Sequence, residues 1–218
     1  MRRFARGLLL FLCVVVGQSI AGAAELAAVD IPHTPETLRK GAETVINVCL
    51  GCHNLKYLKY GDLAKLGFGD KELNTLRNGK SLKEPLQTDM AADMLRESFG
   101  IVPPDLSLMA KAREGGPLYI YTLLTGFYQN ADGSVDNHLF PGIKMPDVLN
   151  FSDAKDPAQR TALQEQARDA AAFLLWAADP HAAERFHLGY YVLVYLFILT
   201  ILLYFSKRRI WSRLDGES

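Results

Sequence analysis

The stretch that decides the fold of this chain is Cys49-Leu50-Gly51-Cys52-His53. Two cysteines separated by two residues and followed at once by histidine are typical of the site where a c-type haem is attached. The two thiols form thioether bonds to the haem vinyl groups, and the adjacent imidazole reaches the iron as an axial ligand. The motif occurs once, so we expect one covalently attached haem per chain.

Two other interpretations of the cysteine pair are a redox-active dithiol and half of a zinc site. A thioredoxin-like dithiol begins a helix within a βαβ unit, and no buried strand is predicted before Cys49. A structural zinc site needs four ligands, and the remaining cysteine and histidines do not pair at the spacing of a second zinc knuckle. These residues are Cys13, His33, His138, His181 and His187.

Residues 1–24 predict a secretory signal peptide. Three arginines within the first six residues form a basic start, residues 8–16 form an apolar core, and residues 21–24 (Ala-Gly-Ala-Ala) form a small-residue cleavage site. Its removal would also remove Cys13, which leaves the two cysteines of the haem motif in the mature chain. We therefore expect residues 25–186 to form a periplasmic haem domain.

A second apolar segment, residues 188–205, contains no charged side chain. As a helix of ~1.5 Å rise per residue it would extend about 27 Å, just enough to span a bilayer. A Lys-Arg-Arg run follows directly and predicts a cytoplasmic end. We expect one transmembrane helix over residues 187–206, a cytoplasmic tail over residues 207–218, and a location in the bacterial inner membrane.

The equal numbers of basic and acidic residues, 24 each, hide an acidic haem domain. The signal peptide contains three basic residues, and the tail contains four basic and two acidic ones. This leaves 17 basic and 22 acidic residues between them, a formal net charge of −5. Such a field attracts a basic protein partner, and we expect no nucleic-acid partner.

We expect the haem domain to be mainly α, with helices joined by long loops. Thr34-Pro35-Glu36 predicts a helix start, and apolar residues recur at helical spacing from Leu38 to Cys49, so this helix brings an apolar face to the haem motif. A second helix is predicted from about residue 158 to residue 178, before Pro180. The segment between them is rich in glycine and proline and shows no convincing strand pattern.

The second axial ligand must come from Met90, Met94, Met109, Met145 or His138. The first three methionines lie in segments with a helical pattern, where methionine usually packs in the core. Met145 lies in Phe140-Pro141-Gly142-Ile143-Lys144-Met145-Pro146, which cannot form a regular helix and would let a thioether point at a metal. Met145 is the predicted ligand, and His138 is the alternative because a second imidazole also ligates haem iron.

Five further motifs, taken with the haem motif, resemble the cytochrome c1 family. They follow one another in the order of that family, cover nearly the whole mature chain and lead into a single C-terminal anchor. They are Pro103-Pro104-Asp105-Leu106-Ser107, Ala112-Arg113-Glu114-Gly115-Gly116, Leu123-Leu124-Thr125-Gly126, Asn137-His138-Leu139-Phe140-Pro141-Gly142 with Met145-Pro146, and Phe173-Leu174-Leu175-Trp176-Ala177-Ala178-Asp179-Pro180. The resemblance implies a class I cytochrome c-like haem domain with long loops and one transmembrane helix.

A member of this family would be the haem subunit of quinol:cytochrome c oxidoreductase, the cytochrome bc1 complex, and an electron carrier rather than a catalyst on its own. Beside cytochrome b in the membrane, it would accept an electron from the Rieske iron–sulfur protein and pass it to cytochrome c. In this resemblance Cys49 and Cys52 attach the haem, His53 and Met145 ligate iron, and Arg113 pairs with a propionate. The other haem contacts that it implies are Pro104, Tyr119, Leu123, Leu124 and Phe140.

Two other functions remain open from the sequence. One is a membrane-anchored c-type cytochrome that donates directly to a terminal oxidase or reductase. The other is a periplasmic thiol oxidoreductase that uses Cys49 and Cys52.

Overall fold

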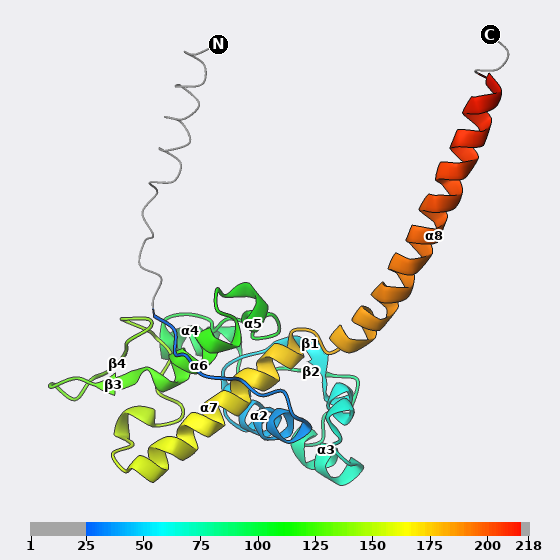
Figure 1. Cartoon of the computed structure of the whole chain (residues 1–218). Coiled ribbons are helices and arrows are strands. Elements are labelled where there is room, and N and C mark those ends of the chain that lie inside the picture. The colour runs from blue at the N-terminus through cyan, green and yellow to red at the C-terminus, as the bar shows by residue number, and fades with distance from the viewer. Residues whose placement is uncertain (1–24, 215–218) are drawn as a thin grey trace, which may run out of the picture.

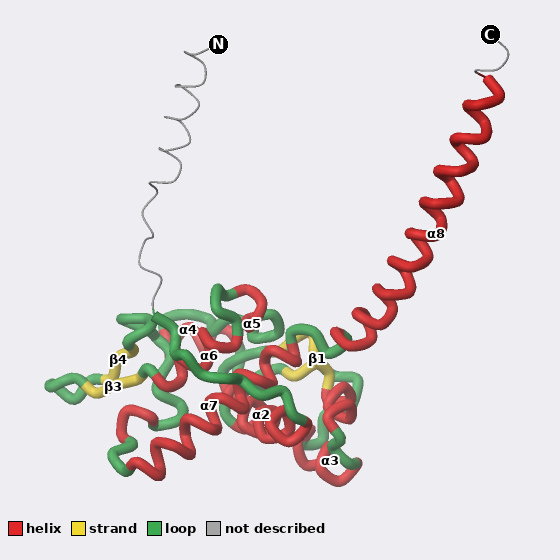
Figure 2. Tube along the Cα trace, viewed as in Figure 1, coloured by secondary structure: helices red, strands yellow, loops and turns green. Residues whose placement is uncertain are grey.

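Residues 25–214 of the chain are described in the structure, a computed structural model. They form a mainly helical domain and one long helix that leaves it, as Figure 1 shows. Figure 2 separates the helices from the long loops and short strands between them. The mainly α class expected from the sequence is confirmed. The predicted signal peptide and the last four residues of the predicted tail lie outside the described residues.

The described elements are seven helices, three 3-10 turns and four short strands. The helices are α2 (Pro35–Asn47), α3 (Asp70–Arg77), α4 (Ala92–Phe99), α5 (Met109–Ala112), α6 (Pro117–Thr125), α7 (Pro157–Ala177) and α8 (Ala182–Leu214), and the turns are η1 (Cys49–Gly51), η2 (Tyr60–Leu66) and η3 (Phe151–Asp153). Strand β1 (Leu55–Lys59) pairs antiparallel with β2 (Pro85–Leu86), and β3 (Phe127–Gln129) pairs antiparallel with β4 (Val135–Asn137). The sequence did not predict these strands, because such short runs do not show an alternating pattern.

Both helices that the sequence predicted begin with a side-chain cap. The hydroxyl of Thr34 accepts a hydrogen bond from the backbone N–H of Thr37 at 3.2 Å, and Pro35 occupies the first turn of α2. The carboxylate of Asp156 likewise accepts from the N–H of Gln159 at 3.1 Å, ahead of α7. The cap sequences therefore fix where both helices begin.

Helices α2 and α7 pack closely because Gly41 has no side chain. A Cβ on residue 41 would lie 2.6 Å from the carbonyl carbon of Asp169, closer still to its oxygen, and 2.8 Å from Cβ of Phe173. Fully buried alanines line the same contact, including Ala42 on α2 and Ala171 on α7. This close packing supports the end of α2, where the haem motif begins.

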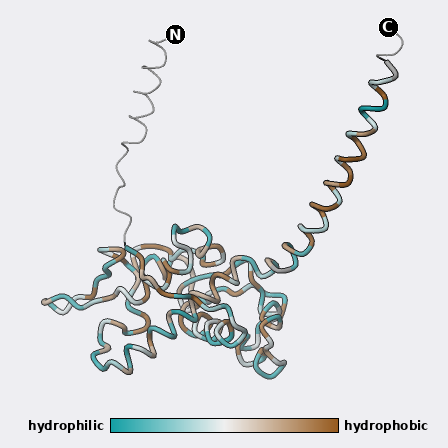
Figure 3. Tube along the Cα trace, viewed as in Figure 1, coloured by the Kyte–Doolittle hydropathy of each residue, from teal (hydrophilic) through white to brown (hydrophobic). Residues whose placement is uncertain are grey.

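Helix α8 is long and apolar enough to cross a membrane, and within residues 25–214 it is the one helix that passes this test. Its apolar side chains are exposed. Figure 3 colours much of this helix as hydrophobic where it extends away from the domain. A helix whose whole circumference is apolar and exposed is unfavourable in water but suited to lipid. The helix fits the single C-terminal membrane anchor expected from the sequence.

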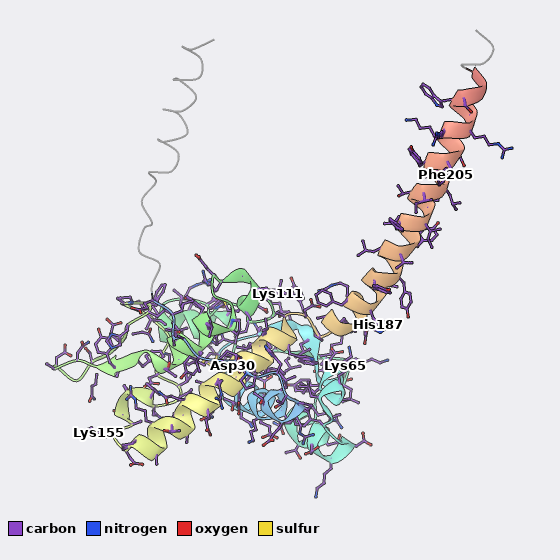
Figure 4. All side chains as sticks on the ribbon, in the orientation of Figure 1. Asp30, Lys65, Lys111, Lys155, His187 and Phe205 are labelled. Carbon is purple, nitrogen blue, oxygen red and sulfur yellow. The ribbon has the colours of Figure 1, made fainter. Side chains whose placement is uncertain are left out.

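The junction between α7 and α8 is held by charged side chains. The carboxylate of Asp179 accepts a hydrogen bond from Nζ of Lys111 at 2.6 Å and two from the guanidinium of Arg185. Nζ of Lys65 lies 3.0 Å from Nε2 of His181, which therefore accepts from it. Figure 4 labels both lysines, and they lie on the domain beside the base of α8. The membrane helix is thus fixed to two separate parts of the domain.

Candidate haem site

The two cysteines and the histidine of the haem motif lie in one tight turn at the end of α2. Val48 caps the helix, and the backbone N–H groups of Cys52 and His53 both donate to the carbonyl of Cys49, at 3.1 and 2.8 Å. Both cysteines are free and half-buried. This turn brings two thiols and one imidazole together over five residues, which is what covalent haem attachment requires.

The environment of Cys49 disfavours thiol chemistry. Burial, and then the neighbouring Cys52, raise the pKa of the Cys49 thiol to about 12. A thiol that stays protonated at neutral pH is a poor nucleophile, whereas thiol oxidoreductases lower this pKa, often at the start of a helix. Here the cysteine pair follows the end of a helix instead. The position of the pair after the end of α2 differs in this respect from that of a thiol oxidoreductase.

His53 is oriented by one strong hydrogen bond. Its Nδ1 lies 2.7 Å from the carbonyl oxygen of Pro104, and since a carbonyl only accepts, Nδ1 donates. Burial lowers the pKa of His53, so the ring is neutral at pH 7. A neutral ring with its proton on Nδ1 keeps the lone pair of Nε2 free for a metal. Two predicted site residues, His53 and Pro104, are therefore in direct contact.

Two residues that the sequence analysis did not single out connect the haem motif to a distant part of the chain. The hydroxyl of Thr88 donates to the carbonyl of Gly51 at 2.9 Å, and Oδ1 of Asn54 accepts from the backbone N–H of Thr88 at 3.0 Å. These partners are 37 and 34 residues apart in the chain. Contacts at such separation leave no local pattern, so sequence periodicity could not reveal them.

The candidates for the second axial ligand occupy different environments. Met145 is half-buried and packs against the same core cluster as Cys49, and it lies in a loop as predicted. His138 is exposed, and its ring stacks on Tyr128 with a centroid distance of 4.1 Å and an interplanar angle of 12°. Met94 is 55% exposed. The imidazole of His138 thus stacks on Tyr128, whereas Met145, like Met109, packs against the core.

The remaining predicted contacts are two pairs of residues and one single residue. The guanidinium of Arg113, which is exposed, lies 5.7 Å from the ring centroid of Tyr119, so these two side chains are brought together. Leu124 is buried in the core, and Leu123 is half-buried on the same helix, α6. Phe140 is 52% exposed, and Pro104 is exposed as well.

Asn137 joins the segment that contains Leu123 to the loop that leads to Met145. It is fully buried; its Nδ2 donates to the carbonyl of Leu123 at 2.8 Å, and its Oδ1 accepts from the N–H groups of Leu139 and Phe140 at 2.9 and 3.2 Å. The sequence placed Asn137 in a family motif but gave it no role. Its side chain satisfies the hydrogen-bonding needs of three backbone groups at once, and only the structure shows that these groups lie within its reach.

These residues fit a covalently bound haem. Two free thiols, a neutral imidazole with an available Nε2 and a half-buried thioether against the core are the donor set of a His/Met c-type haem. The open polar groove between α2 and α7 contains none of the predicted site residues. It is lined by Lys40, Glu43, Thr44, Asn47, Val48, Ala162, Glu165, Gln166 and Asp169.

Comparison with known proteins shows which family the chain matches. Residues 32–214 match the model of the cytochrome c1 family. Cytochrome c1 of Allochromatium vinosum is 32% identical over 86% of this chain and 88% of its own length, and that of Rhodospirillum rubrum is 30% identical over 80% of each chain. A Bradyrhizobium diazoefficiens protein named cytochrome b/c1 is 29% identical over 80% of this chain and 33% of its own length.

The family match covers the haem motif, the loops around it and the membrane helix in one continuous stretch. It brings with it a covalently bound c-type haem, for which the donor set described above is suited. The chain therefore belongs to the cytochrome c1 family, the c-type cytochrome electron-transfer subunit of the bc1 complex.

Proposed function

We propose that this chain holds one haem c and relays single electrons from the Rieske iron–sulfur protein to cytochrome c. Cys49 and Cys52 attach the haem, and His53 and Met145 ligate its iron. When bound, the haem supplies a one-electron redox couple, and no side chain acts as an acid, base or nucleophile. The observation that carries the proposal is the His53–Pro104 hydrogen bond, which leaves Nε2 available beside two free thiols.

The other proposed haem contacts surround this donor set. Arg113, which lies over Tyr119, is the partner of a haem propionate, since a guanidinium pairs well with a carboxylate. An apolar wall around a haem limits water access and so tunes its potential. The residues proposed for that wall are Pro104, Leu123, Leu124 and Phe140.

The membrane orientation follows from charge. Lys207, Arg208 and Arg209 follow the apolar part of α8, and positive residues are retained on the cytoplasmic side. We infer that residues 187–206 span the bacterial inner membrane, that the haem domain is periplasmic, and that residues 1–24 are a cleaved signal peptide.

The proposed partners are cytochrome b, the Rieske protein and cytochrome c. The name of one relative, cytochrome b/c1, joins the first of these to cytochrome c1, which supports a shared complex. The formal charge of −5 over residues 25–186 favours a basic acceptor, because an acidic surface speeds encounters with a basic one.

A pyridine haemochrome spectrum of the purified chain tests covalent attachment. The expected result is a c-type spectrum that stays with the polypeptide after denaturation and acid–acetone extraction, at one haem per chain. The variants Cys49→Ala and Cys52→Ala should each lose one thioether bond and shift the spectrum accordingly. A wild-type chain that releases its haem on extraction would contradict the proposal.

Purification from native membranes tests the place in electron transfer. The proposed function predicts that an affinity-tagged chain copurifies with a quinol-oxidising cytochrome b and an iron–sulfur protein, and that quinol addition reduces its haem. Copurification with a terminal oxidase, without those two subunits, would instead support a direct donor to that oxidase.

A further inference from the structure

The loop of residues 103–107 is fastened to the segment that follows His53 by three hydrogen bonds. The N–H of Leu106 donates to the carbonyl of Asn54 at 2.7 Å. The N–H of Lys56 donates to Oδ2 of Asp105 at 3.2 Å, and the N–H of Tyr57 donates to Oγ of Ser107 at 3.1 Å. Segments about 50 residues apart in the chain are thereby held in one register.

Asp105 has a double role in this attachment. While Oδ2 accepts from Lys56, its Oδ1 accepts from the backbone N–H of Ser107 at 2.8 Å. One carboxylate therefore shapes its own loop and ties that loop to β1. Ser107 is 2% exposed, so its hydrogen bond to Tyr57 is protected from competition with water.

The His53–Pro104 hydrogen bond lies directly beside these contacts. Pro104 directly precedes Asp105, and His53 directly precedes Asn54. The bond between the Pro104 carbonyl and the His53 imidazole is therefore the next contact along these two segments after the three hydrogen bonds above. Proline has no N–H, so Pro104 cannot donate a backbone hydrogen bond that would fasten the loop. The position of its carbonyl thus depends on its neighbours.

We propose that Asp105 and Ser107 are positioning residues that hold the Pro104 carbonyl against Nδ1 of His53 and so set the orientation and basicity of this iron ligand. The inference rests on the proposed role of His53 as an axial ligand. The partner of a ligating histidine fixes its ring orientation and raises its basicity. A weaker Nδ1–H···O bond makes the imidazole a poorer donor to ferric iron, which raises the reduction potential.

The test is a redox titration of full-length, membrane-embedded Ser107→Ala and Asp105→Ala chains, together with electron paramagnetic resonance of the oxidised state. Both variants should show a higher midpoint potential and altered g-values, which report the orientation and strength of the axial ligands. Asp105→Asn keeps an acceptor for the Ser107 N–H and should shift the potential in the same direction by less.

Two controls separate positioning from general loss of stability. Ser98→Ala changes an exposed serine on α4 and should leave both readouts at wild-type values. Leu73→Ala removes a buried side chain on α3, away from the loop, and should lower stability without moving the potential or the g-values.

Wild-type potential and g-values in Asp105→Ala, Asp105→Asn and Ser107→Ala would overturn the inference, as would an equal shift in Leu73→Ala. The proposed function fails separately, by the absence of covalent haem from the wild-type chain in the pyridine haemochrome assay.

Discussion

The sharpest test of the fold is the substitution Gly41→Ala, because it adds one methyl group where two helix backbones meet. The added Cβ would lie 2.6 Å from the carbonyl carbon of Asp169 and 2.8 Å from Cβ of Phe173. Both neighbours are backbone or Cβ atoms, which rotamer changes cannot move. Helices α2 and α7 must therefore separate to accept the methyl group.

The expected cost follows from two opposing effects. Overpacking a tight core contact costs about 1–3 kcal/mol, and the rigid neighbours place this case at the upper end. Alanine in a helix interior gains back about 1 kcal/mol relative to glycine. The net destabilisation is about 2 kcal/mol, which at a urea dependence of about 2 kcal/mol per molar lowers the unfolding midpoint by about 1 M.

The assay is urea unfolding of the detergent-solubilised holoprotein, followed by far-ultraviolet circular dichroism and by the haem absorbance. Glu43→Ala, two residues further along α2 on its exposed face, is the matched control and should change stability by no more than about 0.5 kcal/mol. A Gly41→Ala midpoint equal to that of wild type would refute the close approach of α2 and α7.

Four further predictions address the site and the anchor. Met145→Leu should abolish the near-infrared methionine–iron band and lower the midpoint potential; an unchanged oxidised spectrum would exclude this ligand. Asn137→Ala leaves three backbone groups without their partner and should cost about 2–4 kcal/mol in urea unfolding, whereas a loss below about 0.5 kcal/mol would show that water replaces the side chain. Hydrogen bonds from Arg185 and then Lys111 hold the pKa of Asp179 at about 2, below the ordinary 3.8. The ionised form of Asp179 therefore stabilises the fold above pH 4, and this contribution is lost as the pH falls from 4 to 2. Asp179→Asn should flatten the thermal stability profile over that range, and parallel profiles would contradict the assignment. The rate of cytochrome c reduction should fall as ionic strength rises; a rate independent of salt would remove steering by the acidic domain.

The sequence was most informative where structure is local. Thr34 caps α2 through a hydrogen bond to a residue only three positions away, so this helix start could be predicted from the sequence. Asp156 caps α7 in the same local way, although the sequence analysis did not single it out. The haem motif is equally local, since five consecutive residues contain both thiols and the imidazole. The apolar run in α8 is long enough to be recognised without any knowledge of the rest.

What the sequence could not supply depends on contacts between distant segments. Nothing near Asn54 or Thr88 predicts that they brace the haem motif, because their partners come from elsewhere in the chain. The sequence did not predict the short β-strands for a related reason. Each strand is stabilised by its partner strand and by burial rather than by its own residue pattern. No sequence pattern around Gly41 indicates that a side chain would not fit there. The need for glycine comes from the close approach of α2 and α7.

The short helix α5 connects three features that otherwise look independent. It directly follows the loop that contains Pro104 and Ser107, it ends next to Arg113, and its Lys111 bonds to Asp179 at the base of the membrane helix. A shift of α8 relative to the domain would therefore also move α5. This helix lies in the chain between Pro104, whose carbonyl accepts from His53, and Arg113, the proposed partner of a haem propionate. Lys111 thus links the base of the membrane helix to α5, and the contact between Lys65 and His181 links it to a second part of the domain.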